Sequence, residues 1–146
     1  MSKKPDIDRF AAEIQQLMPA FLGAMVRRER NAISQGIITL PQLLGLSYLR
    51  ANPGSPVKDF AATLGLQLSS ASGLLNRLAK LGLLKRTHST EDRRVVLLTL
   101  TPKGEQMVDE IMKQKRQSIA EIFSPLSPEE RAVYLELMQK VVGQLT

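Results

Sequence analysis

The fold is decided by residues 64–86, which read LGLQLSSASGLLNRLAKLGLLKR. Apolar residues recur here at helical spacing and predict a helix over residues 69–81 that buries Ala71, Leu74, Leu75, Leu78 and Leu81. Gly65 is expected to end a preceding short helix, and Gly82 stands where a helix stop belongs. Two helices joined by the tight turn 66–68 predict a helix-turn-helix.

Upstream, the sequence carries start signals for two further helices. Thr39 and Gln42 form a capping box that opens a helix containing Leu43, Leu44, Leu46 and Leu49. The turn at residues 52–56 follows. Ser55 is expected to cap the next, short helix, with Pro56 at its first position.

Downstream, the hydrophobic period changes from helix to strand. Residues 83–88 and 95–100 are two β-type runs, and the charged segment STEDRR at residues 89–94 connects them. We expect a β-hairpin with a charged tip directly after the second helix of the helix-turn-helix. This order is typical of a winged helix-turn-helix.

Long amphipathic helices are expected at both ends, over residues 6–30, 102–123 and from Ser127 onward. The fold class is therefore mainly α with a small β-hairpin wing (α+β). We expect one domain over residues 1–146, with a DNA-binding lobe at 38–101 and dimerisation helices at 1–37 and 102–146. The apolar stripes predicted to pack across a two-fold axis contain Phe10, Ile14, Leu17, Phe21, Ile119, Ile122, Phe123, Leu137, Val141 and Leu145.

Composition narrows the function classes. The chain has 146 residues, no Cys and one His, which argues against thiol chemistry, disulfides, a His-based triad or a Cys/His metal site. No carboxylate pair or glycine-rich phosphate loop suggests catalysis, so we expect no enzyme, no cofactor and no metal. No stretch is apolar enough for a membrane span or a signal peptide, and a cytoplasmic protein without membrane contact is the default expectation.

The positive charge is concentrated in the middle of the chain. The net charge is +6, and residues 67–94 alone carry six Lys and Arg against two Asp and Glu, a net +4. Such a local basic patch is the electrostatic signature of a nucleic-acid surface, although a solvated helix face is the alternative reading.

The candidate DNA contacts lie on the polar face of the predicted helix and on the wing. Short hydrogen-bonding side chains near the start of a recognition helix can reach base edges, and cations neutralise phosphates. The candidates are Ser69, Ser70, Ser72, Asn76, Arg77, Lys80, Arg86, Arg93 and Arg94. Double-stranded DNA is the partner that this set indicates.

Six ordered pieces of the chain resemble the MarR family of transcriptional regulators. They are LGL (64–66), SSAS (69–72), LLNRL (74–78), KLGLL (80–84), EDRR (91–94) and LTPKG (100–104). The resemblance implies a homodimer that binds a palindromic operator. We expect a repressor, with an activator as the alternative. In the family a small ligand often binds between the DNA-binding lobe and the dimer helices, but this sequence identifies no effector and is also compatible with a constitutive regulator. The resemblance also implies that Arg94 reaches the minor groove and that Asp92 orients nearby basic residues, including Arg77.

Two positions depart from the family pattern. Gln67 stands where a stronger helix cap is usual, and Gly73 stands where a larger polar or basic residue is usual. A glycine cannot read a base and costs about 0.5–1 kcal/mol in a helix interior relative to alanine. The alternative function is therefore a winged-helix protein that contacts another protein and has lost DNA binding.

Overall fold

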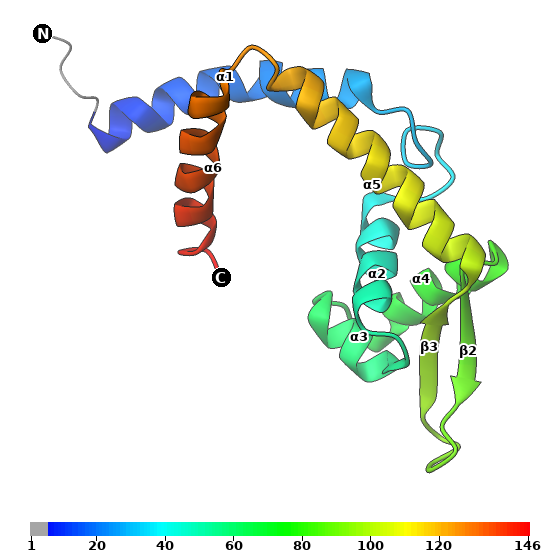
Figure 1. The fold of residues 1–146 in the computed structure, drawn as a ribbon. Coiled ribbons are helices and arrows are strands. Elements are labelled where there is room, and N and C mark those ends of the chain that lie inside the picture. Colours follow the sequence, from blue (N-terminus) through cyan, green and yellow to red (C-terminus); the bar gives the residue numbers. More distant parts are fainter. Residues whose placement is uncertain (1–5) are drawn as a thin grey trace, which may run out of the picture. The chain divides into compact units, whose positions relative to one another are not determined.

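The computed structural model describes residues 6–146 and divides the chain into two compact units. One unit is Arg30–Gln114, and the other joins the chain up to Glu29 with Lys115–Thr146. Figure 1 shows the order of the elements, coloured along the chain.

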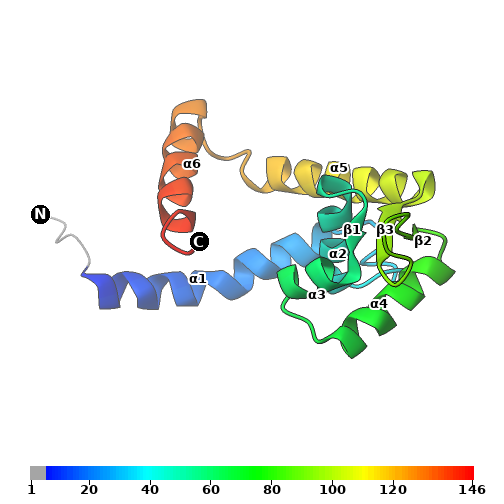
Figure 2. The same ribbon diagram turned by 90° about the horizontal axis from the view of Figure 1, so that it is seen from below.

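The Arg30–Gln114 unit contains the winged helix-turn-helix. Its elements in chain order are α2 (Leu40–Ala51), β1 (Ser55–Pro56), α3 (Val57–Thr63), α4 (Leu68–Lys80), β2 (Leu84–His88), β3 (Val96–Leu100) and the first part of α5 (Pro102–Ile122). The predicted fold class is confirmed: the chain is mainly helical with a small antiparallel sheet. Figure 2 shows α2, α3 and α4 gathered beside that sheet.

The sheet has three strands in the order β1-β3-β2, one more than the predicted hairpin. Ser55 pairs with Leu98, and its hydroxyl donates to the backbone oxygen of Asn52 at 2.7 Å. The prediction that Ser55 caps the next helix was therefore wrong. The N-cap of α3 is Pro56, which makes no side-chain capping bond.

The core of this unit forms where the three helices and the sheet meet. The predicted capping box of α2 is confirmed, since Thr39 and Gln42 bond each other's backbone N–H groups. Helix α4 begins one residue earlier than expected, at Leu68. The buried hydrophobic residues are Ile38, Leu43, Leu46, Leu49, Phe60, Ala61, Ala71, Leu75, Leu78, Leu83, Leu84, Leu98, Leu100, Val108 and Ile111.

Side chains at the start of α5 donate hydrogen bonds to the backbone carbonyls that follow α4. Thr101 donates its hydroxyl hydrogen to the Gly82 carbonyl, and Lys103 Nζ donates to the Leu81 carbonyl at 2.9 Å. Gly104 lies against the Leu83 carbonyl so closely that a Cβ at this position would be 2.0 Å from the oxygen. These contacts hold α4 in a defined place relative to the body of its unit.

The second unit contains α1 (Ile7–Arg28), the remainder of α5 and α6 (Pro128–Val142). Asp6 caps α1, and the predicted capping box of Ser127 and Glu130 starts α6. Phe123 contacts Phe21 and Tyr134 with ring centroids 5.9 and 4.9 Å apart. No helix in the described part of the chain is long and apolar enough to cross a membrane.

Candidate nucleic-acid interface

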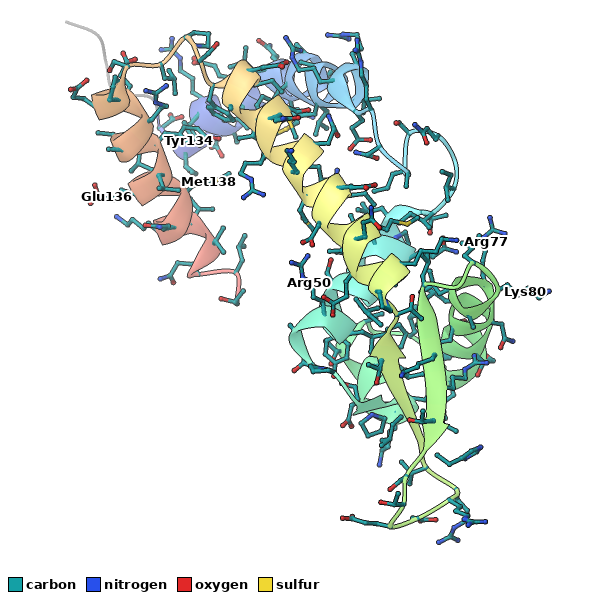
Figure 3. The ribbon with its side chains drawn as sticks, turned by 45° about the vertical axis from the view of Figure 1, so that its right-hand side comes forward. Arg50, Arg77, Lys80, Tyr134, Glu136 and Met138 are labelled. Atoms are coloured by element: carbon teal, nitrogen blue, oxygen red, sulfur yellow. The ribbon has the colours of Figure 1, made fainter. Side chains whose placement is uncertain are left out.

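The exposed face of α4 carries the residues that the sequence singled out. Ala71, Leu75 and Leu78 anchor the helix in the core. The opposite face leaves Ser69, Ser70, Ser72, Asn76, Arg77 and Lys80 exposed to solvent. Figure 3 shows Arg77 and Lys80 pointing outward from α4. Packing of the apolar face therefore fixes which side chains the helix presents.

Most cations of α4 and the wing have no carboxylate partner in the described part of the chain, Arg94 being paired with Asp92. Among the described residues, no carboxylate forms an ion pair with Arg77, Lys80, Arg86 or Arg93. Arg50, in contrast, pairs with Asp109 on α5. Unpaired Arg and Lys side chains are the groups that bind phosphates and displace counterions from DNA. The charge of this surface is thus available to a polyanion.

The wing is the β2–β3 hairpin, whose tip extends beyond the helices of its unit (Figure 1). Backbone bonds close the tip: Ser89 N–H donates to the Val95 carbonyl and Val95 N–H to the Asp92 carbonyl, both at 2.9 Å. The Ser89 hydroxyl oxygen accepts from Glu91 N–H at 3.2 Å. The tip therefore has a defined backbone shape, although its arginine side chains are exposed.

Asp92 organises the tip through Arg94. Its Oδ1 accepts the Arg94 backbone N–H at 3.0 Å and Arg94 Nε at 3.2 Å, and its Oδ2 accepts Arg94 Nη2 at 3.3 Å. The sequence interpretation also named Arg77 as a partner of Asp92, but the described residues show no such pair. The Arg94 side chain remains 92% exposed, so it is oriented and still accessible.

The hydrogen bonds from the side chain and the backbone of Arg94 lower the pKa of Asp92. Because this pKa is lower in the folded than in the unfolded state, the stabilising contribution is present above the unfolded-state pKa and is lost as pH falls through the folded-state pKa. We expect a carboxyl ¹³C NMR titration to show a lowered Asp92 pKa that Arg94→Ala raises. An Asp92 pKa unchanged by that substitution would contradict the pairing.

His88 is a wing residue whose role the sequence did not reveal. It is the last residue of strand β2, and its Nδ1 lies 2.7 Å from the Arg93 carbonyl oxygen. A carbonyl only accepts, so Nδ1 carries the hydrogen and donates it. The bond ties the end of β2 to the segment that carries Arg93 and Arg94. The signal in the sequence is positional, since His88 is the last β-type residue before the charged tip.

The described residues contain no group of three or more His, Cys, Asp or Glu side chains placed to hold a metal ion. The α4 face and the wing offer hydroxyl, amide and cationic groups on one protruding helix and one protruding hairpin. This combination fits the grooves and phosphates of a DNA duplex.

The sequence model of the MarR family matches residues 38–96, which span α2, the helix-turn-helix and most of the wing. This match, together with the relatives below, supports assignment of the chain to the MarR family. The chain is a DNA-binding transcriptional regulator, as members of the MarR family are, rather than an enzyme. The alternative of a winged-helix protein without DNA binding is thereby disfavoured.

Known proteins of this kind are similar along most of the chain. The uncharacterized HTH-type transcriptional regulator YsmB of Bacillus subtilis is 25% identical over 134 residues, which are 92% of each protein. The HTH-type transcriptional repressor MdtR of the same organism is 27% identical over 123 residues, covering 84% of this chain and 79% of MdtR. The crystal structure of B. subtilis YusO has the same fold, with a TM-score of 0.79 and 24% identity over 95% of this chain and 99% of YusO.

Proposed function

We propose that this MarR-family chain is a sequence-specific repressor that binds an inverted-repeat operator as a homodimer. In this proposal α4 enters the major groove with Ser69, Ser70, Ser72 and Asn76 near base edges. Arg77, Lys80 and Arg86 bind phosphates, and Arg93 and Arg94 of the wing reach an adjacent minor groove. A single observation carries the proposal: the cations of α4 and the wing are exposed to solvent. Among the described residues, Arg94 alone of these cations pairs with a carboxylate.

The homodimer is supported by the second unit, which leaves its apolar stripes uncovered. No residue of α1 or α6 is buried, although both helices carry large apolar side chains. Leu17 is 65% exposed and Leu137 57% exposed. Figure 3 shows Tyr134 and Met138 on one side of α6 and Glu136 on the other. Apolar helix faces of this extent are typical of interaction surfaces.

We expect sedimentation at micromolar concentration to show a species of twice the 16.2 kDa chain mass. The physical reason is burial of the α1, α5 and α6 stripes across a two-fold axis. The double substitution Leu17→Glu and Leu137→Glu should shift the equilibrium toward monomer. The replacement Glu136→Gln on the polar side of α6 serves as a control. A wild-type protein that sediments only as a 16.2 kDa species would contradict the dimer.

The operator is defined by selecting bound sequences from a random DNA pool. Because two recognition helices related by a two-fold axis meet successive major grooves, the half-sites should be inverted and about 10 bp apart, or a multiple of that. Footprinting on the selected sequence checks the spacing. Direct repeats or a single asymmetric half-site would contradict the proposed geometry.

Repression and ligand release complete the proposal. Repression is supported by the similarity to MdtR, a transcriptional repressor.

For a small-molecule effector we point to a hollow of about 210 Å³ within the Arg30–Gln114 unit. Asn31 and Gln35 give this hollow polar groups, and Met107 and Ile111 give it apolar walls. A ligand there would contact both α5 and the segment that precedes α2.

A further inference from the structure

In the Arg30–Gln114 unit, the backbone conformation or close packing requires a glycine at every glycine position except one. Four of them have positive φ angles, between 64° and 78°, which other residues rarely adopt: Gly36, Gly54, Gly65 and Gly82. Two more are required by close approach. A Cβ on Gly45 would lie 2.9 Å from Phe60 Cζ, and a Cβ on Gly104 would meet the Leu83 carbonyl.

Gly73 is the exception. It lies in the interior of α4 and does not have a positive φ. Apart from its chain neighbours and the backbone of its own helix, no atom lies within 4 Å of the place where a Cβ would stand. Its position is exposed. Neither backbone conformation nor packing in this structure requires a glycine, and a glycine weakens a helix relative to alanine. A reason for glycine at position 73 is therefore to be sought in contact with another molecule.

The surroundings of Gly73 show what a side chain there would obstruct. Gly73 follows Ser69 by one turn and precedes Asn76 and Arg77 by one turn, so it lies within the polar face of α4. Side chains on a helix lean toward its N-terminus and cover the preceding turn. A side chain at position 73 would therefore stand over Ser69, at the end of the helix that meets base edges.

We propose that Gly73 is a specificity-determining residue: its missing side chain lets α4 lie deep enough in the major groove for the hydroxyls of Ser69 and Ser72 to reach base edges. A serine hydroxyl is short, so it bonds a base only when the helix backbone is close to the DNA. This inference rests on the proposed function, because it assumes that α4 reads an operator. It assigns a role to one of the two positions that depart from the family pattern.

The test compares Gly73→Ala and Gly73→Ser with the wild-type chain in three measurements. These are the thermal midpoint, the affinity for the selected operator and the affinity for a random duplex at the same salt concentration. The thermal midpoint of Gly73→Ala should rise by a few degrees, because alanine favours the helix and meets no neighbour. Operator affinity should fall by about tenfold in both variants, similar to the effect of a mismatched base pair. Affinity for random DNA should change by less than about twofold, because phosphate contacts dominate it.

Gly23→Ala is the matched control. Gly23 lies in α1, in the other unit, and the nearest atoms that a Cβ there would meet outside the helix backbone belong to the flexible guanidinium end of Arg27. Its operator affinity should stay within about twofold of wild type, which shows that a helical Gly→Ala change alone does not weaken binding. Gly73→Ala that is more stable and binds the operator as tightly as wild type would overturn the inference. An equal loss on operator and random DNA would overturn it too. If the wild-type chain itself shows no operator preference, the proposed function fails instead.

Discussion

Gly104→Ala is expected to lower the thermal midpoint by about 10 °C or more, corresponding to a loss of about 3 kcal/mol in the free energy of unfolding. The added Cβ would be 2.0 Å from the Leu83 carbonyl oxygen and 3.0 Å from its carbon, and both are backbone atoms. The same oxygen accepts the Thr101 N–H at 3.1 Å, so a shift that relieves the clash also disturbs this bond.

Thermal or urea unfolding of the purified variant checks this prediction. Gly73→Ala is the control, because the same chemical change at a position without neighbours should raise the midpoint. A midpoint for Gly104→Ala within about 2 °C of wild type would show that the close approach of α5 to Leu83 is not required.

Arg94→Ala is expected to weaken operator binding by about tenfold or more and to flatten the salt dependence by about one unit of slope. A narrow minor groove has enhanced negative potential, so a single arginine there contributes strongly to affinity. Stability should hardly change, because the side chain is 92% exposed. Affinity measured at several salt concentrations, with a melting curve for each protein, tests both parts. An Arg94→Ala variant that binds as wild type would remove the wing from the DNA interface.

Asp92 variants separate two opposing effects at the wing. Removing a negative charge near DNA should tighten binding, whereas losing the group that orients Arg94 should weaken it. We expect Asp92→Ala to bind more weakly, because the carboxylate accepts both the backbone N–H and the guanidinium of Arg94. Asp92→Asn keeps an oxygen for the backbone N–H and should lose less. Tighter binding by Asp92→Ala would show that repulsion dominates.

Local signals predicted the helices and most of their ends. The capping boxes at Thr39 and Ser127 were readable because each involves residues only three positions apart. The buried face of α4 followed from the spacing of Ala71, Leu75 and Leu78. Such features depend on the chain close to each residue, and tertiary structure did not override them.

Features that depend on distant residues were not predictable in the same way. Ser55 resembles a helix cap, but it pairs with Leu98, which lies 43 positions away in the sequence. The partner of Asp92 depends on the turn geometry of the tip, which the residue types alone do not determine. Gly104 has no room for a side chain because it lies against the backbone of Leu83, and the whole β2–β3 hairpin separates these two residues in the sequence. Gly104 belongs to the LTPKG segment that resembles the MarR family, and its contact with the Leu83 carbonyl is the physical reason for a glycine there.

The central claim is that the face of α4 and the wing bind an operator through base and phosphate contacts. The most direct test measures affinity for the selected operator and for a random duplex over a range of salt concentrations, with wild-type protein and Arg77→Ala. The account predicts a steep loss of affinity with rising salt on both DNAs and a preference of at least about a thousandfold for the operator. Arg77→Ala should bind both DNAs more weakly and lower the slope by about one unit. Affinity that does not depend on salt, or equal affinity for operator and random DNA, would contradict the account.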